Sequence, residues 1–449
     1  MIALILCLLA LGTSYWAGKR SLGLGLVVLL TWGYFYGIVR ANLLTTFMYF
    51  VFDAALLGFY LSQKALFTGG DKRSSVLRIW VWLLMLWPVV MLITPFQPFL
   101  VALVGLRGSI LFIPMMLAGS RLRENDLRQL TFGFAALNLI ALCFGVAEYF
   151  LGLERFFPRN AATILIYGSS DVAGGFSRIP AIFTTAHLYG GTMAATVPYL
   201  IAGWEYAQTR KMRWLMLAGI AAALLGVLLS ATRSNFVICA GLIMVTIVNG
   251  RMAARKRVVI ALLILAMAGV AMRNVRLQRF TSLSDTDYVQ DRISGSVNRG
   301  FFEILLEYPM GNGLGGGGTN IPYFLAGQVR NPIGMENEYA RILCEQGVIG
   351  LMLWLAFVVW FITRFRCAFA KGPWVTCRRL VWCLSVLGLG TGAIGMGMLT
   401  AMPQTPIFLL GVGFTATRMR DEAAATQPAG IAPARLQPRP LRPVPSLQS

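Results

Sequence analysis

Charged side chains are scarce in this sequence. Only 13% of its 449 residues are charged, 57% are hydrophobic, and the mean hydropathy is +0.68. A soluble chain of this length would normally form two or three domains with far more charge. The apolar residues instead fall into blocks of roughly 17–25, the length at which a helix crosses about 30 Å of hydrocarbon. The composition therefore excludes a soluble globular protein and predicts an all-α, polytopic membrane helix bundle.

The apolar blocks predict about twelve to thirteen membrane spans. They lie near 1–18, 21–39, 43–62, 77–94, 96–119, 128–150, 181–204, 213–230, 235–249, 257–272, 340–363, 380–399 and 404–417. The first block lacks the basic start and the small-residue cleavage site of a signal peptide, so we expect it to be retained as a span. We expect a transmembrane bundle at 1–272 with a minor external loop at 151–180, a large external loop at 273–334, a second bundle at 335–420 and a disordered cytoplasmic tail at 421–449.

Histidine and paired cysteines are also nearly absent. His187 is the only histidine, and the seven cysteines are scattered without a CxxC pair. Zinc sites in proteins are built mainly from these two residue types at short spacings. The pattern therefore argues against a zinc site, nothing in the cysteine spacing predicts disulfides, and we expect neither a metal nor another cofactor.

Acidic residues are few, with 18 Asp and Glu against 39 Lys and Arg, which gives a formal net charge of +21. A charge of this size can indicate nucleic acid as a partner, but the basic residues cluster in alternate loops between the apolar blocks. Lys and Arg beside a span favour the cytoplasmic side. The pattern predicts the N-terminus and the segments 151–180 and 273–334 outside, with the C-terminus inside. The charge thus orients the protein in its membrane, and we expect no nucleic acid partner.

Glycines cluster in the large loop, in the run 311–318 (GNGLGGGG). A dinucleotide site would need a preceding strand, and a P-loop would need a following Gly-Lys-Ser/Thr, and neither pattern is present. We expect a tight turn in which Gly313 and Gly315 let the backbone approach a ligand or a neighbouring helix. Apolar residues at 301–306 predict a short amphipathic helix before Pro309, lying against the membrane surface.

Two ionisable residues interrupt apolar blocks. Arg107 lies within FQPFLVALVGLRGSILFIPMM and Asp53 within MYFVFDAALLGF. A charge in the bilayer costs several kcal/mol unless it is paired or hydrated. Two interpretations stand: the residues are structural partners or reached by water, or Arg107 binds an anionic lipid headgroup.

Two further residues stand near the predicted external surface. His187, in IFTTAHLYGG, is either a hydrogen-bonded structural residue or part of a site. Arg233, in LLSATRSNF, occupies a very short external turn beside Thr232, Ser234 and Asn235. The positive-inside tendency opposes an arginine there, which favours a functional role.

Four stretches of the chain together resemble the O-antigen ligase and polymerase superfamily. They are SRIPAIFTTAHLYGGTMAATVPYL, ATRSNFVICAGL, NRGFFEILLEYPMGNGLGGG and ENEYARILCEQGVIGLMLWL, and they span roughly residues 170–365. The resemblance implies a GT-C-like, metal-independent glycosyltransferase of the bacterial inner membrane, with its active site facing the periplasm. Its donor would be a glycan on undecaprenyl diphosphate, transferred as one block. Polymerases pass the glycan to another lipid-linked repeat, and ligases pass it to lipid A core or to a protein hydroxyl.

The resemblance also implies site residues. Arginines outside the membrane can stabilise a departing diphosphate in place of a metal ion. Arg233, Arg292 and Arg299 are the candidates, with Arg178 in reserve, and their division between phosphate and glycan stays open. Glu336-Asn337 stands where ligases of the group have His-Asn.

The departure at Glu336 leaves two interpretations. Glu336 either takes a proton from the acceptor hydroxyl, or pairs with an external arginine and organises the loop. Asn337 beside it would bind substrate. Glu338, Arg341 and Glu345 share one helix face and predict a paired structural stripe.

The sequence thus favours a polymerase of O-antigen or exopolysaccharide repeats. The alternatives are a ligase or protein O-oligosaccharyltransferase with the same donor and, more remotely, a flippase or secondary transporter. Expected partners are the lipid-linked glycan as donor and acceptor, membrane lipids, and a chain-length regulator and flippase of the same pathway.

Overall fold

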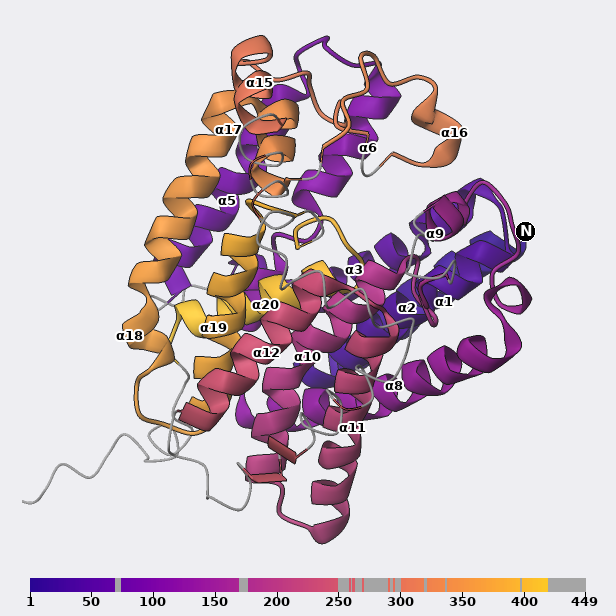
Figure 1. The fold of residues 1–449 in the computed structure, drawn as a ribbon. Coiled ribbons are helices and arrows are strands. Elements are labelled where there is room, and N and C mark those ends of the chain that lie inside the picture. The colour runs from indigo at the N-terminus through magenta and orange to yellow at the C-terminus, as the bar shows by residue number, and fades with distance from the viewer. Residues whose placement is uncertain are drawn as a thin grey trace, which may run out of the picture. The chain divides into compact units, whose positions relative to one another are not determined.

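The described part of the chain is built from helices (Figure 1). The structure is a computed structural model that describes residues 1–68, 74–168, 177–248, 300–318, 321–335, 337–395 and 398–418, with isolated positions between 258 and 294. No strand occurs among these residues. The helices are α1 (Ile2–Arg20), α2 (Leu22–Asn42), η1 (Thr46–Phe50), α3 (Val51–Ser62), α4 (Ala65–Thr68), α5 (Ser75–Met91), α6 (Phe99–Ile110), α7 (Met115–Gly119), α8 (Glu124–Leu151), η3 (Leu153–Arg155), α9 (Ile164–Gly168), α10 (Ala186–Tyr206), α11 (Arg210–Leu229), α12 (Arg233–Val248), α15 (Gly300–Glu307), α16 (Tyr323–Ala326), α17 (Glu338–Thr363), α18 (Phe365–Ala368), α19 (Val375–Thr391) and α20 (Gln404–Ala416).

Six helical segments of the described chain are long and apolar enough to cross a membrane. They are α1, α2, α8, α11, α17 and the combined segment Phe99–Gly119. This confirms a polytopic membrane helix bundle. Four shorter apolar helices overlap other predicted spans, and the full number of spans stays a prediction. The predicted span 257–272 and the tail 421–449 lie largely or wholly outside the described residues.

Several predicted spans are interrupted rather than continuous. The span at 43–62 begins with the 3-10 turn η1, and the span at 96–119 breaks after Ile110, shortly before Pro114. The span at 340–363 is broken at Gly347, where φ is 68°, and α19 ends at Thr391. Hydropathy could not show these breaks, because it averages over a window. Irregular backbone at membrane depth is tolerated where protein buries it or where it lines a cavity.

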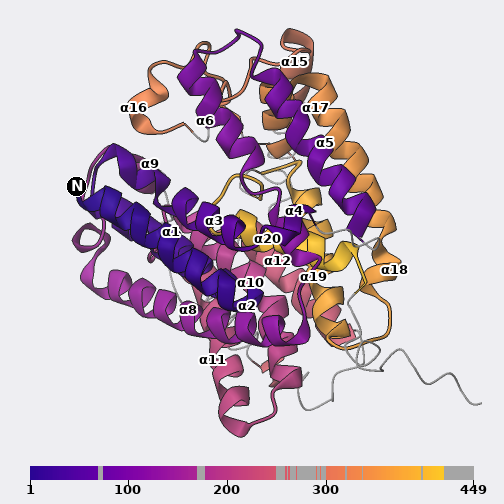
Figure 2. The same cartoon turned by 180° about the vertical axis from the view of Figure 1, so that it is seen from behind.

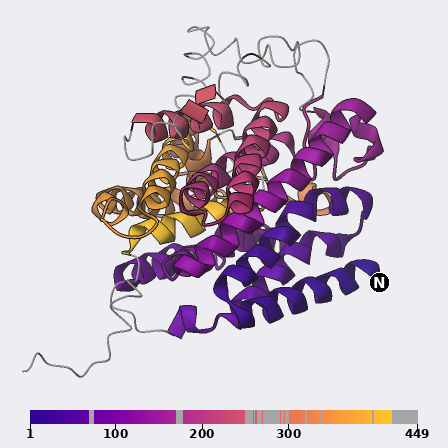
Figure 3. The same cartoon turned by 90° about the horizontal axis from the view of Figure 1, so that it is seen from below.

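The first helices pack in one layer, where α1 lies against α2 and α3, and α2 lies against α8 (Figures 2 and 3). Small residues allow the close contacts: a Cβ on Gly58 would overlap the backbone of Leu11. Behind this layer, α10 is packed against α8, α11, α12, α19 and α20, and its residues from 188 to 204 are all buried. The core of the bundle therefore centres on α10.

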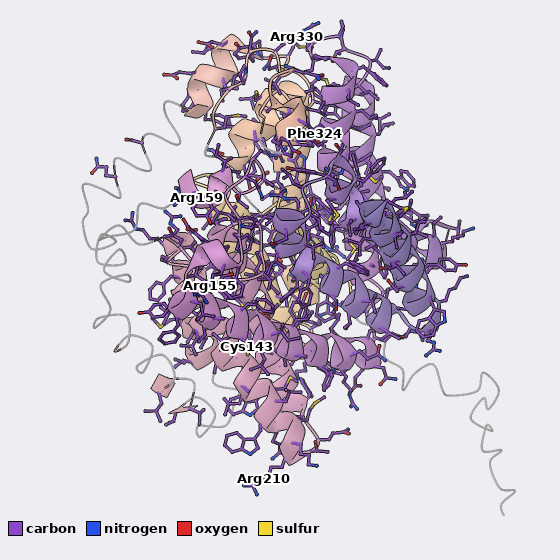
Figure 4. The ribbon with its side chains drawn as sticks, turned by 90° about the vertical axis from the view of Figure 1, so that its right-hand side faces the viewer. Cys143, Arg155, Arg159, Arg210, Phe324 and Arg330 are labelled. Atoms are coloured by element: carbon purple, nitrogen blue, oxygen red, sulfur yellow. The ribbon has the colours of Figure 1, made fainter. Side chains whose placement is uncertain are left out.

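A second group of helices, α5, α6, α15, α16 and α17, occupies one end of the bundle (Figure 1). The predicted amphipathic helix is α15, which ends before Pro309, buries Ile304 against the core and exposes Leu306. Arg330, in the loop predicted to be external, and Arg210, in a loop predicted to be cytoplasmic, lie at opposite ends (Figure 4). The N-terminus and α9 lie at a similar height in Figures 1 and 2, which agrees with the same predicted side for both.

Candidate functional site

Asn337 begins α17 as its N-cap. Its Oδ1 accepts hydrogen bonds from the backbone N–H groups of Tyr339 at 2.9 Å and Ala340 at 3.2 Å. Its Nδ2 donates to the carbonyl of Ala393 at 2.6 Å, and the residue is buried. An asparagine N-cap satisfies backbone donors that the first helical turn leaves free. Asn337, which the resemblance implies as a substrate contact, thus holds the start of α17 against the turn after α19.

The predicted stripe of Glu338, Arg341 and Glu345 forms two buried ion pairs. Arg341 Nη2 lies 2.6 Å from Glu338 Oε1, and Arg341 Nη1 lies 2.7 Å from Glu345 Oε2. All three side chains are at most 3% exposed. Burial of an ion is costly, so each carboxylate depends on the guanidinium group between them. The prediction of a paired structural stripe is confirmed.

The break in α17 at Gly347 joins the helix to the glycine-rich loop. A Cβ on Gly347 would lie 2.8 Å from the carbonyl carbon of Met310, so both the positive φ and the close approach require glycine. Backbone groups at the break find partners outside the helix: Trp87 Nε1 donates to Gln346 O at 2.9 Å, Asn312 N to Cys344 O at 2.6 Å, and Val348 N to Pro309 O at 3.0 Å. These hydrogen bonds replace those that the helix loses at the break, as backbone polar groups inside a membrane require.

The glycine run forms the tight turn that its composition predicts. Gly311, Gly313 and Gly315 have φ values of 85°, 85° and 80°. The turn lies directly on α6, because a Cβ on Gly105 would overlap the backbone of Gly315. Gln97 links the glycine turn to the stretch after α16. Its Nε2 donates to the Asn312 carbonyl and its Oε1 accepts from the Arg330 N–H, both at 2.9 Å. The predicted approach to a neighbouring helix is confirmed, and that helix is α6.

Replacing Gly105 by alanine is expected to loosen the loop from α6. The matched control is Gly12→Ala in α1, because a Cβ there meets nothing within 4 Å. Alanine raises helix propensity at both positions by roughly 0.5–1 kcal/mol. We therefore expect Gly12→Ala to keep or raise the unfolding temperature, and Gly105→Ala to lower it and to speed proteolysis between 311 and 330. Equal unfolding temperatures and cleavage rates for the two variants would contradict this packing.

Arg107 and Asp53 are ion-pair partners, the first of the two interpretations of these residues. Arg107 Nη2 donates to Asp53 Oδ1 at 2.8 Å, and Nε bonds the other carboxylate oxygen. Their side chains are 17% and 14% exposed. The interrupted spans explain the placement, since Asp53 lies in the first turn of α3 and Arg107 in the last turn of α6. Both charges therefore stand at the helix ends whose dipoles favour them.

His187 and Arg233 lie on segments that touch. Asn235 Nδ2 donates to the backbone carbonyl of His187 at 3.0 Å and to Thr232 Oγ1 at 3.1 Å. A Cβ on Gly190 would lie 2.5 Å from Thr232 Oγ1, so that glycine lets the turn before α12 pack against α10. The structure thus brings together two candidates 46 positions apart in sequence.

Glu148 is a buried acid that sequence reasoning missed. It is 3% exposed, and its Oε2 accepts from the N–H of Ala181 at 2.9 Å, while its Oε1 has no hydrogen-bond partner among the described residues. It holds the segment that carries Arg178, which is half-buried. An acid in the last turn of an apolar block was the only sequence signal, and it is easily taken for one that faces water.

Three implied site residues, Arg292, Arg299 and Glu336, lie outside the described residues. Within the described chain, no group of three or more His, Cys, Asp or Glu side chains could hold a metal ion. Comparison of the sequence with protein-family models gave no match, and comparison with curated proteins gave none either.

Proposed function

We propose that the protein is a polymerase that joins oligosaccharide repeats carried on undecaprenyl diphosphate, at the external face of the inner membrane. The proposal rests on the resemblance of four sequence stretches to the O-antigen ligase and polymerase superfamily. The supporting structural observation is that these stretches meet in pairs. The glycine loop contacts α17 at its break, and the start of α12, which bears Arg233, packs against the segment bearing His187.

The chemistry of the transfer explains why arginines matter. The hydroxyl oxygen of the acceptor sugar forms a bond to the anomeric carbon of the donor glycan, and the bond from that carbon to the diphosphate oxygen breaks. The electron pair leaves with the diphosphate, and the hydroxyl proton passes to a base. A guanidinium group stabilises the charge that develops on the diphosphate, and it can do so through two parallel hydrogen bonds. Arg233, Arg292 and Arg299 are the proposed residues for this role.

Glu336 is the proposed base. Of the three acids in the motif, Glu338 and Glu345 are both bonded to the buried Arg341. A carboxylate held in that way cannot accept a proton without losing its ion pair. Glu336 immediately precedes the N-cap Asn337 in the sequence, in the position where ligases of the superfamily have histidine. Glu336 is therefore the acid of the motif that we propose for proton transfer.

The proposal is tested with purified protein and a lipid-linked repeat unit as the sole substrate. We expect a ladder of lipid-linked products that differ by one repeat. One undecaprenyl diphosphate should be released for each new glycosidic bond. A ligase would make no ladder from this substrate alone, and would give a product only with lipid A core or a protein acceptor. Absence of any new glycosidic bond under all these conditions would reject the proposal.

The second candidate, a flippase or transporter, is favoured by one observation. The Arg107–Asp53 pair joins two interrupted helices inside the predicted membrane region, and such discontinuous helices form substrate sites in transporters. Protein reconstituted into sealed vesicles separates the two functions. A flippase would move the lipid-linked repeat across the bilayer without changing its length.

A further inference from the structure

Arg40 lies on the predicted external side of the membrane, where the positive-inside tendency does not favour an arginine. It lies in the last turn of α2, at the end of that helix predicted to be external. Its Nη2 donates to the neutral carbonyl of Ala162 at 3.2 Å, and its Nε has no hydrogen-bond partner among the described residues. Arg40 also forms no ion pair within the described part of the chain. Its positive charge is therefore not neutralised there.

Arg40 shares a neighbour with Arg107. The Arg40 guanidinium carbon lies 5.0 Å from the centre of the Tyr49 ring, and Arg107 Nη2 donates to the Tyr49 carbonyl at 3.4 Å. Tyr36 completes the group, because its hydroxyl donates to the same carbonyl at 3.4 Å and its ring lies 5.5 Å from the Arg40 guanidinium carbon. Both guanidinium groups thus contact Tyr49 of η1, one at its ring and the other at its carbonyl.

The charges around η1 do not balance. Asp53 is the one carboxylate bonded to either arginine within the described chain, and it is fully engaged with Arg107. One positive charge is left over at a place where most side chains are apolar or aromatic. Groups that are partly buried are screened less than surface charges, so the excess attracts an anion strongly.

Exposed apolar side chains of α6 and η1 lie near these arginines. Leu100 and Leu103 stand one and two turns before Arg107 on the same face of α6, and they are 50% and 42% exposed. Phe47, at the start of η1, is 59% exposed. In a membrane bundle such side chains face lipid. A ligand at the arginines could therefore keep a hydrocarbon chain in the bilayer.

The large loop contacts Tyr49 as well. Tyr323 and Phe324 of α16 contact the Tyr49 ring, with centroid distances of 5.9 and 5.5 Å. Gln97 ties the stretch after α16 to the glycine turn through the Arg330 N–H. The loop that carries the motif segments is thus connected to η1 by two aromatic contacts.

We infer that Arg40, Tyr49 and Arg107 form a binding site for phosphate on a lipid headgroup, entered from the bilayer along α6. Arg40 supplies the unneutralised charge, Arg107 is held in place by Asp53, and the aromatic side chains of α16 pack on Tyr49. The assignment of this lipid as an undecaprenyl-diphosphate-linked substrate rests on the proposed function. An anionic phospholipid carries the same chemistry and is the other source.

Binding of lipid to the purified full-length protein tests the site by native mass spectrometry. Undecaprenyl diphosphate, phosphatidylglycerol and phosphatidylcholine are titrated separately. The variant is Arg40→Gln, whose amide can still donate to the Ala162 carbonyl, so that the fold is kept and the charge is lost. The matched control is Arg20→Gln, because Arg20 also stands in the last turn of its helix and lies over an aromatic ring, Trp16, but at the predicted cytoplasmic end.

We expect Arg40→Gln to weaken binding of undecaprenyl diphosphate about tenfold, the effect of one lost charge-assisted contact, and Arg20→Gln to leave it unchanged. Arg40→Lys, which keeps the charge, should recover part of the loss. An equal loss for phosphatidylglycerol would identify a general phosphate-lipid site, and a loss confined to undecaprenyl diphosphate would identify a site for the lipid-linked substrate.

Wild-type affinity of Arg40→Gln for both anionic lipids would overturn the inference. The outcome is independent of the proposed function. A protein that binds the diphosphate lipid through Arg40 but makes no polymer would keep the site and reject the polymerase. Normal polymer together with unchanged lipid binding in Arg40→Gln would reject the site and keep the polymerase.

Discussion

Replacing Arg341 by methionine is expected to lower the free energy of unfolding by about 3–5 kcal/mol, because it leaves two buried carboxylates without a partner. Glu338 and Glu345 are bonded to Arg341 at 2.6 and 2.7 Å and are nearly inaccessible to water. Methionine has a similar volume, so most of the cost comes from charge rather than from a cavity. Most proteins are stable by only about 5–15 kcal/mol, so the variant should accumulate poorly in the membrane. Denaturant unfolding in detergent measures the effect.

Two further variants separate charge from packing. Arg128→Met breaks the pair between Arg128 and Glu124, which has the same spacing of four residues but side chains 41% and 34% exposed. Exposed pairs contribute about 0.2–1 kcal/mol, so this control should be close to wild type. The triple variant Glu338→Gln, Arg341→Met, Glu345→Gln removes all three charges and should regain most of the stability. A single Arg341→Met variant as stable as the control would show that the buried pairs contribute little.

Local patterns predict the helices and the Arg341 stripe, because both depend on neighbours within a few positions. Spacings of three and four residues place Glu338, Arg341 and Glu345 on one face whatever the rest of the fold. Apolar blocks likewise predict helices, as the confirmed bundle shows. Interruptions escape this reasoning. Gly347 lies in a stretch whose average hydropathy is high, and its break depends on partners from Pro309 to Asn312 and on Trp87, which are distant in sequence.

The candidate site likewise combines features that local sequence predicts with features that depend on distant partners. Arg107 and Asp53 stood out because a charge inside an apolar block is rare, but their pairing depends on two helices that end near each other. Arg40 did not stand out, because it closes an apolar block and resembles an ordinary loop arginine. Its contact with Tyr49 exists only because η1 folds back beside α2. Glu148 was hidden for the same reason, since only the tertiary structure shows that the segment at 181 covers it.

The second large effect concerns catalysis. Arg233→Ala is expected to lower the rate of polymer formation per folded protein by about 10²–10³-fold, the effect of removing one preorganised donor to a developing anion. Arg233→Lys keeps the charge but loses the planar, two-pronged donor, so we expect an intermediate rate. The measurement is kcat/KM for ladder formation from a lipid-linked repeat, normalised to folded protein.

Controls for Arg233 distinguish chemistry from structure. Ser234→Ala alters the next residue of α12, which is exposed, and Arg210→Ala removes an exposed arginine at the end of the bundle opposite Arg330 (Figure 4). Both should keep the wild-type rate. If Arg233 only holds the turn against α10, then folded protein and polymer should fall together, and the normalised rate should stay constant. If Arg233 contacts the diphosphate, the normalised rate falls while the unfolding temperature is kept, because the Asn235 bond to His187 that fastens the turn is left in place. Normal long chains from Arg233→Ala would remove Arg233 from the site.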